Sequence, residues 1–150
     1  MAAYVWDADA TFRVTDIVRH GVICLGRAVT KCNGRCSWEI DHKYGSNAAV
    51  ARDLLRVMSA SPPDAVTDIQ LRQLASHCLC NFHQGQVRQV VPELKRYLAV
   101  AVQAYKQYCD ANRQHEALLG RLSATLGLDD GEQSDETVVR RVKYLAEMAG

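Results

Sequence analysis

The sequence predicts a mainly α-helical protein with a small β-knuckle, one long helix and a C-terminal helix. Three observations support this fold class. Apolar residues recur in steps of three and four between residues 86 and 126, which is the period of a long helix. The dipeptide Asn33-Gly34 is a strong hairpin signal. Cysteines and histidines gather around this turn and again at 77–83, so two separate segments carry the residues with distinctive chemistry.

Length and composition place the chain among globular proteins. With 150 residues it can bury the core of one domain, and 48% apolar and 23% charged residues exclude a mainly disordered or fibrous chain. The formal net charge of +1 does not demand a nucleic-acid partner, although bases outnumber acids between residues 12 and 56. This basic front half permits contact with phosphate without requiring it.

The N-terminal segment lacks the features of a signal peptide. MAAYVWDADATFRV carries acids where a signal peptide needs bases, and no segment is long and apolar enough to span a bilayer. We therefore expect an intracellular protein with no membrane partner, in the nucleus rather than the cytoplasm. In a reducing compartment, clustered cysteines bind metal more often than they form disulfides.

Residues 12–85 are predicted to form one module. Two short strands flank the Asn33-Gly34 turn and carry Cys24 and Cys36. Two short helices follow, the first capped by Ser46 or Asn47 and ended by Pro62 and Pro63, the second capped by Asp64 or Thr67. Their inward-facing residues are predicted to be Val50, Leu54, Val57 and Met58 in the first helix and Ile69, Leu71 and Leu74 in the second.

Residues 86–127 are predicted to form one long helix, or two with a break near Asn112 or Gly120. We expect this helix to pack on the front module, and the alternative is a coiled-coil seam with another chain. Residues 128–150 are predicted as a polar linker and a final amphipathic helix that folds back on the long helix. The apolar stripe of the long helix comprises Val91, Leu94, Leu98, Ala101, Tyr105, Tyr108, Asn112, His115, Leu119, Leu122 and Leu126.

The two clusters of cysteine and histidine predict a metal site. Zinc takes four sulfur or nitrogen ligands in a tetrahedron, commonly as two pairs from separate elements. Cys80 and His83 form a C-x2-H pair directly before the long helix, and Cys24 and Cys36 form a second pair across the turn. The predicted site is therefore one structural Zn²⁺ ion bound by these four residues. Cys109, alone on the long helix, is predicted to be a small buried apolar residue.

Alternative ligand sets stay open at this point. Cys32 is an alternate for Cys24, and Cys78 is an alternate for Cys80, because each lies close to the residue that it would replace. A two-metal cluster that uses all of these residues is a further alternative, whereas His77 is left as a bystander. Disulfides or several free buried cysteines are the alternatives without metal.

Two segments resemble a known family. CLGRAVTKCNGRCSWEI is similar to the pattern C-x-A-x-T-x-x-G-x-x-C-x-x-x-I, and LASHCLCNFHQGQVRQVV is similar to L-x-x-L-[CL]-L-C-x-x-[HY]-H-x-x-Q. Both patterns occur, in this order, in filamentous-fungal proteins, many of which carry a phage-type GIY-YIG-like domain further along. The resemblance covers roughly residues 20–98 and implies a small zinc-binding module associated with nucleic acid.

The resemblance aligns Cys24, Cys36, Cys80 and His83 with the cysteine and histidine positions of that family. The chain departs from the pattern in the longer spacing between Cys24 and Cys36, with Cys32 inserted in the loop. The 150 residues contain no nuclease-like domain, so the resemblance implies no catalytic function.

The predicted function is a non-enzymatic module for protein interaction, an adaptor or recruitment domain without a small-molecule substrate. Four protein ligands leave no open position on zinc, and the motifs of deaminases, P-loop enzymes and dinucleotide-binding enzymes are absent. One alternative is a self-assembling helical scaffold that pairs along the long helix. Another is a nucleic-acid-binding zinc module that uses Arg27, Lys31, Arg35 and Lys43, with Trp38 as a stacking residue rather than a core residue.

Overall fold

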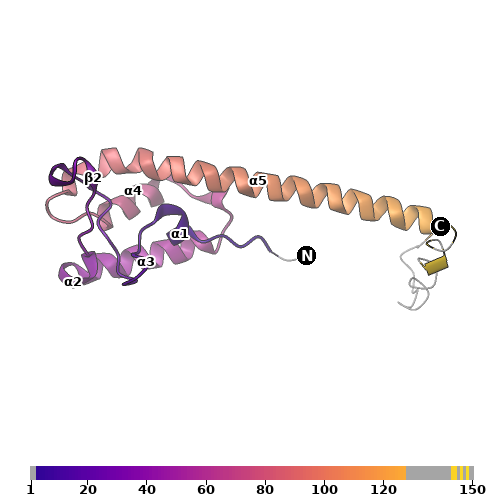
Figure 1. Cartoon of the computed structure of the whole chain (residues 1–150), viewed down its shortest axis with the longest axis horizontal. Coiled ribbons are helices and arrows are strands. Elements are labelled where there is room, and N and C mark those ends of the chain that lie inside the picture. The colour runs from indigo at the N-terminus through magenta and orange to yellow at the C-terminus, as the bar shows by residue number, and fades with distance from the viewer. Residues whose placement is uncertain (1–2, 128–142, 145, 147, 149–150) are drawn as a thin grey trace. The chain divides into compact units, whose positions relative to one another are not determined.

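A computed structural model describes residues 3–127 and, near the C-terminus, Lys143, Tyr144, Ala146 and Met148. The chain divides into two compact units, Met1–Gln107 and Tyr108–Gly150. Figure 1 labels the larger helices along the chain. The predicted fold class is confirmed, because helices dominate and the described residues form one two-stranded sheet. The elements are α1 (Ala8–Phe12), β1 (Arg27–Ala28), η1 (Val29–Lys31), β2 (Gly34–Arg35), α2 (Ile40–Lys43), α3 (Gly45–Ser59), η2 (Pro63–Ala65), α4 (Asp68–His77), η3 (Gln84–Gln86) and α5 (Val87–Leu126).

The predicted knuckle is present, but its strands are only two residues long, and both Cys24 and Cys36 lie outside them, so their assignment to the strands is wrong. Strands β1 and β2 are antiparallel, and Arg27 pairs with Arg35. The turn between them contains η1 and then two residues with left-handed backbone, Cys32 at φ 52° and Asn33 at φ 60°. Asparagine tolerates this conformation better than most residues, which explains why the Asn-Gly signal located the turn correctly.

An N-terminal helix, α1, is an element that the sequence pattern did not reveal. The Asp7 carboxylate accepts hydrogen bonds from the backbone N–H groups of Asp9 and Ala10 and so caps this short helix. Ala8 and Phe12 are fully buried, and the indole N–H of Trp6 donates to the carbonyl oxygen of Ser61 at 2.6 Å. The core therefore begins before residue 12.

Helix α3 ends where the sequence predicts, but its N-cap and its buried face differ from the prediction. It ends at Ser59 ahead of the two prolines, as predicted, whereas its N-cap is Tyr44 without a side-chain hydrogen bond, so the prediction of Ser46 or Asn47 is wrong. The inward face consists of Ala48, Ala51, Leu55 and Met58, with Leu54 partly buried and Val50 and Val57 exposed. The predicted face was therefore wrong for both valines, because the small alanines let α3 lie close to its neighbours.

Helix α4 has the predicted cap and most of the predicted face. Thr67 accepts a hydrogen bond from the Gln70 backbone N–H while the Gln70 side chain accepts one from the Thr67 N–H, which makes a capping box. Leu71 and Leu74 are buried as predicted, but Ile69 is 68% exposed, so its assignment to the core was wrong.

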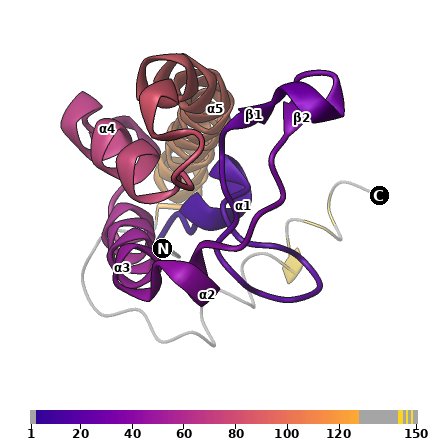
Figure 2. The same cartoon turned by 90° about the vertical axis from the view of Figure 1, so that its left-hand side faces the viewer.

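Helix α5 is one continuous helix of 40 residues, without a break at Asn112 or Gly120. Its first turns lie between α4 and the knuckle (Figure 2), where Lys95 forms an ion pair with Asp68 and Arg27 forms one with Glu93. The apolar stripe packs on the core of the first unit as far as Tyr105, whose ring centroid lies 4.9 Å from that of Tyr4. The residues of the stripe that contact this core are Val91, Leu94, Leu98, Ala101 and Tyr105.

The second unit is described only in part. Leu118, Leu119 and Leu122 of α5 are about half exposed. The predicted linker and most of the final helix lie outside the described residues, although Lys143, Tyr144, Ala146 and Met148 have helical backbone. Among the described residues, no helix is long and apolar enough to cross a membrane.

The buried face of α4 gives a direct test of the fold. Leu74→Ala removes a fully buried side chain, so we expect the free energy of unfolding to fall by about 2–5 kcal/mol. Ile69→Ala, on the same helix but 68% exposed, serves as the control and changes stability by less than about 0.5 kcal/mol. Urea unfolding followed by circular dichroism measures both, and equal losses would contradict the orientation of α4.

Candidate metal centre

Four side chains meet between the knuckle and the loop that precedes α5. The ligand atoms of Cys24, Cys36, Cys80 and His83 all lie within 4.8 Å of one another. The three cysteines are buried and the histidine is half-buried. The structure thus brings together the four residues predicted as zinc ligands.

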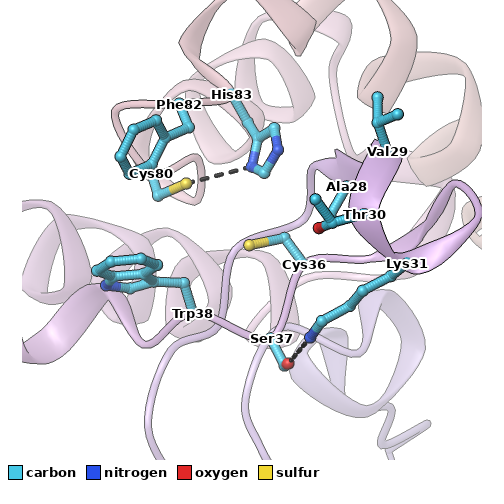
Figure 3. A pocket seen from close by; sticks show the side chains of 10 residues that line it. All are labelled: Ala28, Val29, Thr30, Lys31, Cys36, Ser37, Trp38, Cys80, Phe82 and His83. Atoms are coloured by element: carbon cyan, nitrogen blue, oxygen red, sulfur yellow. Dashed lines mark hydrogen bonds between the residues drawn. The ribbon is translucent and has the colours of Figure 1, made fainter.

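The spacing of these atoms suits a small tetrahedral ion. The Nδ1 atom of His83 lies 3.2 Å from the Sγ atom of Cys80 and 3.5 Å from the Sγ atom of Cys24 (Figure 3 shows the first contact). Standard zinc bond lengths place a sulfur and a nitrogen ligand roughly 3.6 Å apart around a tetrahedral ion. A Cys₃His donor set at such distances fits zinc.

Backbone hydrogen bonds orient the ligands within each half of the cluster. The Cys24 N–H donates to the Trp38 carbonyl at 2.8 Å, and the Cys36 N–H donates to the Gly26 carbonyl at 2.8 Å. In the loop between α4 and α5, the His83 N–H donates to the Cys80 carbonyl at 2.9 Å and closes a turn. Each pair of ligands is therefore oriented by its own local backbone before any ion binds.

The surroundings of Cys24 are those of a thiolate ligand. The backbone N–H groups of Gly26 and Cys80 both donate to its Sγ atom, each at 3.3 Å. Burial raises the pKa of the Cys24 thiol to about 12, against the lowering effect of these two donors. A bound cation would favour the thiolate that the two donors are oriented to receive, and this supports a metal at the cluster.

Gly26 is a part of the site that the sequence pattern did not reveal. A Cβ atom at this position would lie 2.6 Å from both the Cβ and the Cγ atoms of His83. Only a residue without a side chain therefore allows the knuckle to approach the histidine so closely. The only sign of its role in the sequence is its position two residues after Cys24, because the close approach of two backbone segments cannot be recognised from one glycine.

The remaining cysteines lie elsewhere. Cys32 is exposed, and Cys78 is fully buried, where burial raises its thiol pKa to about 12. Neither belongs to the four-residue group, and the described residues assemble no second metal cluster. Cys109 is only partly buried, so its predicted burial was wrong, and all six cysteines are free thiols. His77 contacts Asn47 instead, with Nδ1 and Oδ1 3.1 Å apart.

The described basic residues proposed for nucleic acid differ in their surroundings. Arg27 makes an ion pair with Glu93, with Nη2 and Oε1 2.6 Å apart. Arg35 is half-buried, and its Nε and Nη2 atoms have no hydrogen-bond partner among the described residues. Lys31 is exposed and donates to the hydroxyl oxygen of Ser37 at 2.5 Å, while the side chain of Lys43 lies outside the described part of the chain.

Two arginines, Arg27 and Arg35, act on the carboxyl group of Glu93. Burial acts to raise the pKa of the Glu93 carboxyl, but hydrogen bonds from Arg27 and Tyr97 and the nearby positive charge bring its pKa below the usual value. Burial lowers the pKa of the Arg35 guanidinium. One carboxylate therefore faces two guanidinium groups, of which that of Arg27 is ion-paired and that of Arg35 is half-buried.

Substitution of single cysteines tests the ligand set. Cys24→Ser, Cys36→Ser and Cys80→Ser each remove a ligand, so each is expected to lose most of the single zinc ion bound per chain. Cys32→Ser serves as the control and keeps the ion, because Cys32 lies outside the group. Elemental analysis of the purified proteins measures this, and full zinc content in Cys24→Ser would rule out the assignment.

Substitution of Gly26 tests the packing against His83. In Gly26→Ala the added methyl group displaces the histidine ring, and we expect zinc affinity to fall by about 10–100-fold. Gly85→Ala is the matched control, because a Cβ at Gly85 meets no atom within 4 Å. Competition with a chromophoric chelator gives both affinities, and similar values for the two variants would contradict the close approach.

Comparisons of the chain with family models, with curated proteins and with solved structures found no match.

Proposed function

We propose that this protein is a non-enzymatic adaptor module in which one structural zinc ion holds a protein-interaction surface in place. One observation supports the proposal above all: the ligand atoms of three cysteines and one histidine, from two distant segments, lie within 4.8 Å of one another. The resemblance to filamentous-fungal zinc modules implies the same four ligands. The nuclear location stays a prediction.

A zinc ion at this position would connect the two parts of the module. Cys24 and Cys36 flank the two-stranded knuckle, whereas Cys80 and His83 belong to the loop that leads into α5. Two-residue strands make few hydrogen bonds and give little stability by themselves. The free energy of zinc binding would therefore contribute directly to the folding of the knuckle.

The donor set argues against catalysis. Catalytic zinc sites keep one coordination position for water or substrate, whereas four protein ligands close the coordination sphere. The only residues in the described metal group are the three cysteines and His83, with no carboxylate to act as a general base. The geometry thus favours a structural ion.

A protein partner is favoured over nucleic acid by the balance of charge and apolar surface. Arg27 is paired with Glu93, which removes one of the four bases that would contact phosphate. Several large apolar side chains are exposed instead, including Phe82 at 76% and Val29 at 86% in the first unit. The alternative of a self-assembling scaffold is supported by Leu119 and Leu122 of α5, which are about half exposed in the second unit.

Removal of the metal tests the structural role. The purified chain is expected to contain one zinc ion, and a strong chelator should make the backbone amides of the knuckle and the loop before α5 exchange rapidly with solvent. Amides of α4, which has its own capping box and buried leucines, should stay more protected. Hydrogen exchange by mass spectrometry with and without chelator measures this difference.

The same preparation distinguishes the two partner classes. At low salt the zinc-loaded protein is expected to give no electrophoretic shift with duplex DNA or single-stranded RNA. The proposal of a protein-interaction module would fail if the preparation held no metal. It would fail equally on a salt-dependent shift that disappears when Arg27, Lys31 and Arg35 are all changed to glutamate.

A further inference from the structure

A cavity opens beside the candidate metal centre, within the first unit. It has a volume of 580 Å³, within the range of about 300–1,000 Å³ that is usual for ligand pockets. Figure 3 shows that Cys36, Cys80 and His83 form one part of its wall, η1 of the knuckle a second, and the rings of Trp38 and Phe82 a third. An ion bound by the cysteines would fill only a small part of this space.

The two rings form an aromatic pair, Trp38 and Phe82, that depends on the metal ligands. Their centroids are 5.9 Å apart, with an angle of 49° between the ring planes. Each ring belongs to the second residue after a ligand, in Cys36-Ser37-Trp38 and in Cys80-Asn81-Phe82. An ion that holds both cysteines would therefore also fix the backbone on which the two rings stand.

The aromatic pair is unusually open to solvent for rings that touch each other. Trp38 is 46% exposed and Phe82 is 76% exposed, and Val29 on the opposite wall is 86% exposed. Aromatic side chains on a rigid frame are the residues that most often dominate the binding energy of protein interfaces. This part of the cavity is thus suited to receive bulky apolar side chains.

The charges around the cavity indicate which charge a partner's side chain would carry. Among the described residues that line it, Lys31 carries a full positive charge and no carboxylate is present. Its Nζ atom lies at one side, where it donates to the Ser37 hydroxyl oxygen. A zinc ion with three thiolates has a net negative charge, so a carboxylate of a partner would pair with Lys31 and stay away from Cys36 and Cys80.

We propose that this cavity binds a short peptide segment of a partner protein, with bulky apolar side chains against the aromatic pair and an acidic side chain at Lys31. This inference rests on the proposed function and names the chemistry of its partner. Single-stranded RNA would also offer nucleobases for stacking and phosphates for Lys31. Its binding, however, needs several basic side chains that are available to the phosphate backbone. Arg27 is paired with Glu93 and is therefore less able to contact phosphate. The knuckle is better suited to bind a peptide than a phosphate backbone.

The test begins with a selection that assumes no particular peptide. The zinc-loaded full chain is used to select binders from a displayed library of short random peptides. We expect the selected peptides to share bulky apolar residues next to aspartate or glutamate. The strongest is then synthesised, and its dissociation constant is measured by fluorescence anisotropy against the parent protein and its variants.

Three variants identify the surface. Phe82→Ser is expected to weaken binding by roughly tenfold or more, because it removes an aromatic contact. Lys31→Glu should weaken binding several-fold and reverse its dependence on salt, because the new carboxylate repels the acidic side chain of the peptide. Ile69→Ser is the control, since Ile69 is also an exposed apolar residue, at 68%, but lies on α4 and does not line the cavity. Trp38→Ser replaces Phe82→Ser if the latter loses zinc.

The outcomes separate this inference from the proposed function. Zinc content is measured in every preparation, and a parent protein without zinc overturns the proposed function itself. If zinc is bound but no peptide is selected, only the peptide site is overturned. The same holds if the selected peptides are basic, or if binding survives both Phe82→Ser and Trp38→Ser. Binding of single-stranded RNA that requires Phe82 and Lys31 would reassign the cavity to nucleic acid.

Discussion

The convergence of Cys24, Cys36, Cys80 and His83 is the arrangement on which the knuckle and its connection to α5 depend. It joins a hairpin with strands of two residues each, which has little stability of its own, to the loop that precedes α5. Two backbone N–H groups directed at the Cys24 sulfur and the missing side chain at Gly26 show how closely the two segments are fitted. Without a cation, this close approach of buried sulfur atoms costs free energy, because the thiols make few hydrogen bonds.

The helical core and the candidate metal centre stabilise different parts of the first unit. Helices α1, α3 and α4 bury Phe12, Met58 and Leu74, and this apolar core needs no metal to be favourable. The knuckle adds few apolar contacts beyond Leu25 and Ala28, so it depends on the ligands instead. A segment held by a bound metal could present the rings of Trp38 and Phe82 to solvent without losing its fold.

Charge within the first unit is arranged to hold elements together more than to attract a polyanion. Arg27 of the knuckle pairs with Glu93, Lys95 pairs with Asp68, and Arg52 pairs with Asp41. Exposed pairs of this kind contribute little stability each, but they consume positive charge that a nucleic acid would require. The described lining of the cavity beside the candidate metal centre is mainly apolar and aromatic, with Lys31 as its one lysine.

The sequence by itself determined those features that depend on neighbouring residues: the Asn33-Gly34 turn, the Thr67 cap, the stop before Pro62 and the long helix. Each is decided by local backbone chemistry, which a short pattern records. The grouping of ligands into two pairs could also be predicted, because Cys80 and His83 lie within one turn and Cys24 and Cys36 flank one hairpin. Only the tertiary structure decided that α3 packs through Ala48 and Ala51 rather than its valines, and that Gly26 makes room for His83. Both are matters of close approach between segments far apart in the chain, which the period of apolar residues does not encode.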